Sequence, residues 1–211
     1  NVYTLAHEMG HSVHSYFTRT NQGYHYGDYP IFLAEIASTT NESLLTDYLL
    51  STNDDPNFRA YVLNQYLDGF KGTVFRQTQF AEFEDWLHQT AAAGQALTAE
   101  TLSDFYMALN QKYYGADLFP DEEIAYEWSR IPHFYYDYYV YQYATGEAAA
   151  TTLAEGILES DQAEAYNQVL KSGSSKYPVD VMKAAGVDMS QKDYLNQACN
   201  ICEQRLKELE R

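Results

Sequence analysis

Residues 7–11 read His7-Glu8-Met9-Gly10-His11, and they lie in a segment, about residues 1–18, whose apolar side chains recur at helical spacing. The same spacing continues along most of the chain, for example at residues 31–51 and in a tyrosine-rich segment at residues 134–158. Uninterrupted alternation of apolar and polar residues, the pattern of a half-buried strand, is hard to find. We therefore predict an all-α, multi-helix fold.

The spacing of the two histidines in this stretch favours a metal site. On a helix, side chains at positions i and i+4 lie about 40° apart on one face, so His7 and His11 can bind the same ion. Glu8 projects about 100° from His7, where it can take a proton from a metal-activated water instead of binding the metal. The motif predicts metal ligands at His7 and His11 and a general base at Glu8.

A third metal ligand is expected, because a catalytic zinc ion takes three protein ligands and keeps one position for water. The class that uses a third histidine needs Gly three residues after the second histidine and His six residues after it, but this chain has His14 and Phe17 there. A carboxylate on the next helix is the other solution. Glu35 lies in an otherwise apolar helix face, where an unpaired charge would be costly to bury. We predict Glu35 as the third ligand of one Zn²⁺ ion.

A second acid follows Glu35 on the same helix face. Glu42 lies seven residues, or about two helical turns, further along the chain. A ligand histidine commonly donates its other ring N–H to a carboxylate, which fixes the orientation of the ring. We predict such a hydrogen bond for Glu42, and we leave His14 outside the metal site as a structural histidine.

The charge of the chain limits its partners. The 211 residues include 13 Lys and Arg against 30 Asp and Glu, which gives a formal net charge of −17, and 45% of the residues are hydrophobic. This composition is typical of an acidic globular chain, and its charge repels phosphate backbones and anionic lipid headgroups. We expect neither nucleic acid nor a membrane as a partner, and the oligomeric state stays open.

Two further observations concern the context of the chain. Its only cysteines are Cys199 and Cys202, which do not resemble the disulfide framework of a secreted protein. We therefore expect a reducing compartment, the cytoplasm. The first residue is Asn1 rather than Met, so we expect residues 1–211 to be one domain that begins inside a longer protein.

Four motifs follow one another along the chain. They are His7-Glu8-Met9-Gly10-His11-Ser12-Val13-His14-Ser15, Tyr26-Gly27-Asp28-Tyr29, Phe32-Leu33-Ala34-Glu35-Ile36-Ala37-Ser38-Thr39-Thr40-Asn41-Glu42 and Arg130-Ile131-Pro132-His133-Phe134-Tyr135. Together they resemble the oligoendopeptidase F family of thimet-oligopeptidase-like zinc metallopeptidases. The resemblance runs through the whole chain but covers only the C-terminal catalytic part of a family member, so the N-terminal part of the parent protein is expected to be absent.

The resemblance implies a zincin-like catalytic domain whose zinc site lies between the H-E-x-x-H helix and the following helix. In that family the zinc lies in a deep channel, so the implied partners are short unstructured peptides. The family's metal ligands and catalytic glutamate fall on His7, His11, Glu35 and Glu8.

The resemblance also assigns a role to the last motif. The family carries a histidine followed by catalytic tyrosines where this chain has His133 and a run of tyrosines. Neutral imidazole N–H and tyrosine O–H groups can stabilise the negative charge that develops on a peptide carbonyl oxygen under attack. Tyr136, Tyr139 and Tyr143 would lie near one helix face. We predict His133, Tyr139 and Tyr143 as catalytic residues.

Three functions fit these expectations. The first is a zinc-dependent endopeptidase that hydrolyses short oligopeptides with Glu8 as general base. The second is a peptidyl-dipeptidase of the related helical zinc class, which shares the H-E-M-G-H run. The third is an inactive fragment that holds zinc or binds peptides, because the chain starts at Asn1 and lacks the other part of the channel.

Overall fold

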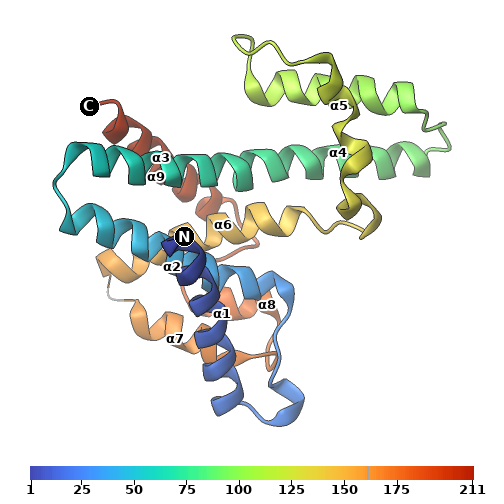
Figure 1. Cartoon of the computed structure of the whole chain (residues 1–211). Helices are drawn as coiled ribbons and strands as arrows, with labels where there is room; N and C mark the ends of the chain where they lie inside the picture. The colour runs from blue at the N-terminus through green and yellow to red at the C-terminus, as the bar shows by residue number, and fades with distance from the viewer. Residues whose placement is uncertain (161) are drawn as a thin grey trace. The chain divides into compact units, whose positions relative to one another are not determined.

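The computed structural model describes residues 1–160 and 162–211 (Figure 1). All regular elements in these residues are helices, so the prediction of an all-α fold is confirmed. None of the described helices combines the length and the apolar composition needed to cross a lipid bilayer. The described chain divides into two compact units, and we describe each by itself. The single domain expected over residues 1–211 stays a prediction.

Unit 1 comprises Asn1–Phe70 and Thr145–Arg211. Its elements are α1 (Val2–Asn21), η1 (Tyr24–Tyr26), α2 (Ile31–Thr52), α3 (Pro56–Phe70), most of α6 (Tyr141–Ser160), α7 (Ala163–Ser172), α8 (Pro178–Ala184) and α9 (Asp193–Leu209). Within this unit α1 packs on α2 and α7, while α3 packs on α9 (Figure 1).

Helix α1 is fixed at both of its ends. At the start, the Asn1 side chain accepts a hydrogen bond from the backbone N–H of Thr4 at 3.0 Å, which satisfies one of the free N–H groups of the first turn. Near the end, the buried Thr18 hydroxyl donates to the Leu170 carbonyl oxygen of α7 at 2.8 Å. The histidines of residues 7–11 therefore lie on a helix whose ends are anchored.

Unit 2 comprises Lys71–Ala144. Its elements are η2 (Lys71–Phe75), which is a π-helical turn, α4 (Arg76–Ala92), α5 (Ala99–Tyr114), η3 (Glu122–Arg130), η4 (Pro132–Tyr135) and the first residues of α6. Helix α5 packs on both α4 and η3. The apolar faces of α4 and α5 form a buried core with two residues from the connecting segments, Ile131 and Val140; the core side chains of the two helices are Phe80, Phe83, Leu102, Tyr106 and Leu109.

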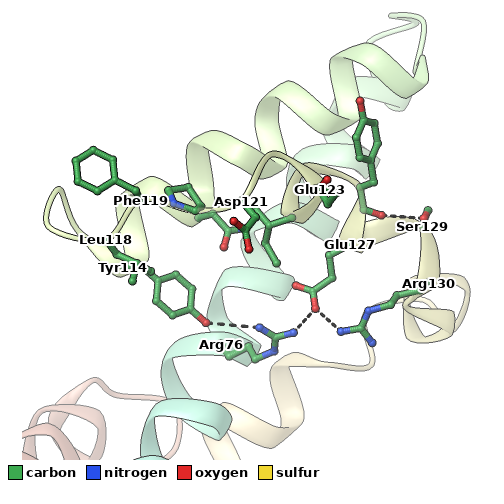
Figure 2. Close-up of a pocket in the computed structure, with 13 residues that line it drawn as sticks. Arg76, Tyr114, Leu118, Phe119, Asp121, Glu123, Glu127, Ser129 and Arg130 are labelled. Atoms are coloured by element: carbon green, nitrogen blue, oxygen red, sulfur yellow. Dashed lines mark hydrogen bonds and ion pairs between the residues drawn. The ribbon is translucent and has the colours of Figure 1, made fainter.

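A buried carboxylate joins three elements of unit 2. Glu127 of η3 forms ion pairs with Arg76 of α4 and with Arg130, and it accepts a hydrogen bond from the Tyr106 hydroxyl at 2.6 Å. Figure 2 shows both guanidinium groups directed at this carboxylate, beside a hollow of about 830 Å³. Burial opposes ionisation, but the Tyr106 hydrogen bond and the two cations outweigh it, so the pKa of Glu127 lies below its usual value.

The helix predicted over residues 134–158 is wrong in its first part. The chain leaves the helical conformation between η4 and α6, where Asp137 and Tyr138 adopt left-handed φ angles of 54° and 60°. The backbone N–H of Tyr138 donates at 2.8 Å to the carboxylate of Glu84, a buried residue of α4. A contact with another helix thus takes the N–H group that a continuous helix would use internally. Only the part from Tyr141 onward is α-helical as predicted.

Candidate metal centre

The candidate centre lies where α1 crosses α2 in unit 1. Two contacts show how these helices pair: the Tyr3 hydroxyl is 3.1 Å from Thr46 Oγ1, and further along α1 the backbone of Gly10 lies against Ser38. Partner numbers on α2 fall as residue numbers on α1 rise, so the two helices run antiparallel. This pairing places the His7–His11 stretch opposite the Glu35–Glu42 stretch.

Gly10 allows the two backbones to approach closely. A Cβ atom at this position would lie 2.5 Å from the Cα atom of Ser38 and 2.9 Å from the carbonyl oxygen of Ala37. Both of these atoms belong to the backbone of α2, and Cβ atoms in proteins essentially never come within 3.0 Å of a non-bonded atom. The glycine within the H-E-x-x-H stretch therefore sets the distance between the two helices.

The structure brings the three predicted ligands together. Glu35 Oε2 lies 3.4 Å from His7 Nε2 and 3.9 Å from His11 Nε2, and all three ligand atoms lie within 4.8 Å of one another. A tetrahedral zinc ion with bonds of about 2.0–2.2 Å keeps its ligand atoms about 3.3–3.6 Å apart. The 3.4 Å separation between Glu35 and His7 already fits this range. The 3.9 Å separation between Glu35 and His11 fits it after a small inward movement of these two side chains. All three side chains are partly buried.

Glu42 fixes the orientation of the first histidine. Its Oε1 atom lies 2.5 Å from His7 Nδ1, so the hydrogen bond predicted from the sequence is present. Because Nδ1 carries the hydrogen in this bond, the lone pair of the other ring nitrogen is left for a metal. Since that nitrogen, Nε2, is the atom near Glu35, Glu42 presents the correct side of the ring to the site.

Substitution of Glu42 by Ala is expected to weaken zinc binding by about 10–100-fold, because His7 loses the acceptor that fixes its ring. Titration with a competing chelator measures the affinity. Glu42→Gln keeps an acceptor oxygen and should lose less, and Asp54→Ala, at an exposed acid after α2, serves as the matched control. Equal affinities for Glu42→Ala and Asp54→Ala would contradict the positioning role of Glu42.

Glu8 lies beside the three-ligand cluster and outside it. It is exposed, and with His11 it lines a hollow of about 630 Å³ along α1. A carboxylate in this place can reach a water or a peptide bound in the hollow without occupying a ligand position. The geometry therefore fits the predicted base, while the catalytic role of Glu8 stays a prediction.

His14 is completely buried and lies apart from the cluster of possible metal ligands. Its ring stacks on that of Tyr29, with ring centroids 3.6 Å apart and an angle of 7° between the planes. Burial, and to a smaller extent the nearby His11, lowers the pKa of His14 to about 4, so this ring is neutral near pH 7. His14 thus lies outside the metal cluster as expected, but neither of its ring nitrogens has a hydrogen-bond partner among the described residues.

Glu147 of α6 is a residue of this region that sequence reasoning missed. Burial, with a smaller contribution from the negative charge of Glu42, raises the pKa of Glu147 to about 8. Near pH 7 a protonated Glu147 therefore adds no second negative charge to the surroundings of Glu42. The available signal was the one that identified Glu35, an acid within an apolar run, here Gly146-Glu147-Ala148-Ala149-Ala150.

The predicted catalytic residues of the last motif form a cluster in unit 2. The His133 ring centroid lies 5.4 Å from that of Tyr139 and 6.3 Å from that of Tyr143, and the two tyrosine rings are 5.7 Å apart. Tyr143 belongs to α6, but Tyr139 precedes this helix, so the single helix face expected for the two tyrosines is wrong. Turn geometry brings them together instead. Their catalytic roles stay predictions.

An all-α fold with two histidines and a glutamate at metal-ligand distances, and a second glutamate after the first histidine, is typical of helical metallopeptidases. The sequence matches Peptidase family M3 over residues 1–201, and the chain belongs to this family. The family-level resemblance noted from the four motifs is thereby confirmed.

Three relatives illustrate how close the similarity is. The chain is 58% identical to group B oligopeptidase PepB of Streptococcus agalactiae and 55% identical to oligopeptidase PepF of Bacillus subtilis, with 100% of this chain and 35% and 32% of those proteins covered. A crystal structure of oligoendopeptidase-F from Enterococcus faecium superposes with a TM-score of 0.89 and 61% identity, over 99% of this chain and 38% of that one.

The chain thus spans about a third of the length of these relatives. These matches do not support the narrower expectation that this third is the C-terminal catalytic part, which stays a prediction. Family M3 membership implies a metallopeptidase, which agrees with the donor set of the site.

Proposed function

We propose that the chain is the zinc-binding, C-terminal catalytic part of a cytoplasmic endopeptidase that hydrolyses short oligopeptides. The observation that carries the proposal is the cluster of His7, His11 and Glu35, with Glu8 beside it. The names of the relatives, which are oligopeptidases and oligoendopeptidases, favour short peptides as substrates. The two free thiols, Cys199 and Cys202, suit a reducing compartment.

The proposed chemistry divides the work among a few side chains. A zinc ion held by His7, His11 and Glu35 would supply a Lewis acid that polarises the peptide carbonyl and acidifies a water molecule. Glu8 takes the proton from the attacking water and passes it to the leaving amine. We assign the stabilisation of the carbonyl oxygen to N–H or O–H donors of His133, Tyr139 and Tyr143.

The first test is the zinc content of the freshly purified chain, measured by elemental analysis together with a Glu35→Ala variant. We expect about one zinc per chain in the parent and much less in the variant, because one of three protein ligands is lost. Glu100→Ala, at an exposed acid of α5, is the control and should keep its zinc. A parent without zinc even after reconstitution would overturn the proposal, and equal zinc in Glu35→Ala would overturn the role of Glu35.

The peptidyl-dipeptidase alternative uses the same residues and differs in its products. A peptidyl-dipeptidase needs a free C-terminus and releases dipeptides, whereas an endopeptidase also cleaves a peptide that is blocked at both ends. Mass spectrometry of the products from a doubly blocked octapeptide decides between them. Cleavage within the blocked peptide is the result that we expect.

A further inference from the structure

The hollow beside Glu8 and His11 extends along α1 away from the proposed metal. Its lining side chains are those of Glu8, His11, Ser12, Ser15, Tyr16, Arg19 and Thr20. Glu8, Ser12, Ser15 and Arg19 follow one another at intervals of three or four residues, which places them on one helix face. One continuous surface therefore links the proposed base to a guanidinium group.

The length of this surface suits a short piece of extended peptide. Arg19 follows His11 by eight residues, and at a rise of about 1.5 Å per residue the two positions lie about 12 Å apart along the helix axis. An extended peptide advances about 3.3 Å per residue, so this distance corresponds to roughly three to four residues. A substrate cleaved near His11 would place the third or fourth residue from the cleaved bond near Arg19.

Arg19 is available to bind a ligand. It is exposed, and it takes part in none of the ion pairs that the described residues form. Among the described residues that line this hollow, it is the only Lys or Arg. A guanidinium group binds a carboxylate through two parallel hydrogen bonds. On a chain with a net charge of −17, such a group provides a local site for an anion.

We propose that Arg19 determines specificity by binding a carboxylate of the peptide substrate, three to four residues from the bond that is cleaved. The carboxylate is either the C-terminus of a short peptide or the side chain of an Asp or Glu residue. This inference rests on the proposed function, because it assumes that a peptide lies along α1. The competing account is that Arg19, in the last turn of α1, only stabilises the helix dipole.

The test measures peptide affinity in a Glu8→Gln background, in which cleavage is expected to be at least about 100-fold slower. Three probes are compared by calorimetry: N-acetyl-pentaalanine as the free acid, the same peptide as the C-terminal amide, and an amide whose last residue is Glu. We expect the amide without Glu to bind about tenfold more weakly than at least one of the carboxylate peptides. The tighter of the two carboxylate peptides identifies the source of the group.

The difference in affinity between the carboxylate peptides and the amide without Glu is expected to disappear in Arg19→Gln and to survive in part in Arg19→Lys. It should remain in Lys176→Gln, a control at an exposed lysine of unit 1. In the active protein, Arg19→Gln should raise KM for the carboxylate peptides without changing kcat. Discrimination that persists in Arg19→Gln, or that is absent in the parent, would overturn the proposal. The affinity measurement does not depend on peptide cleavage. A negative result for Arg19 can therefore be told apart from a negative result in the zinc or cleavage experiments, which test the proposed function.

Discussion

Replacement of Glu8 by Gln is expected to lower kcat/KM for a short blocked peptide by about 100- to 10,000-fold, the usual contribution of a positioned general base. The substitution keeps the size of the side chain and removes its ability to take a proton. Glu8 lies outside the three-ligand cluster, so zinc content should remain at the parent level. The Ser12 hydroxyl donates to the backbone oxygen of Glu8 at 2.9 Å, and this bond is unaffected.

Two measurements make this result specific. Elemental analysis shows whether Glu8→Gln still holds its zinc, and a thermal unfolding curve shows whether the fold is intact. Glu100→Gln provides a charge-matched control on α5 and should keep full activity. Parent-like turnover in Glu8→Gln would remove Glu8 from the mechanism, whereas lost activity with lost zinc would indicate that Glu8 supports the metal instead.

The second large effect is expected for Gly10→Ala. The added Cβ atom would meet the Cα atom of Ser38 at 2.5 Å, so α1 and α2 must move apart. Overpacking of this kind costs about 1–3 kcal/mol of stability. For a chain of this size each kcal/mol corresponds to roughly 2–4 °C in Tm. Zinc affinity should fall as well, because the same movement separates Glu35 from the two histidines.

Gly69→Ala is the matched control for this prediction. Gly69 also lies in a helix of unit 1, α3, but a Cβ atom there would have no neighbour within 4 Å. Because Ala is a better helix former than Gly by about 1 kcal/mol, Gly69→Ala should raise Tm. The two substitutions are thus expected to change Tm in opposite directions. A Gly10→Ala variant with unchanged Tm and zinc affinity would show that the α1–α2 contact tolerates the extra methyl group.

The metal cluster could be predicted from the sequence because regular helix geometry fixes most of it. His7 and His11 share a face by their spacing alone, and Glu35 stands out as an acid in an apolar helix face. The hydrogen bond from His7 to Glu42 followed from the spacing of Glu42 from Glu35. In each case the signal lies within one helix, or in the expectation that two consecutive helices pack together.

The features that escaped prediction depend on contacts between distant segments. Glu147 approaches Glu42 from α6, more than a hundred residues further along the chain, and no local pattern encodes that approach. The break before α6 depends on a carboxylate of α4, since Glu84 accepts a hydrogen bond from the backbone N–H of Tyr138. Periodicity alone favours a continuous helix there, because the tyrosine-rich sequence carries no glycine or proline at residues 136–140.

The close contact at Gly10 also limits how this sequence can evolve. At Gly156, a Cβ atom would meet the side chain of Gln162, so a second substitution that shortens Gln162 can restore the fit. At Gly10 the obstacle is the main chain of α2, which every amino acid shares. A side-chain substitution on α2 therefore cannot make room for a larger residue at position 10. If positions 10 and 38 are randomised together and stably folded variants are selected, position 10 should remain glycine whatever occupies position 38.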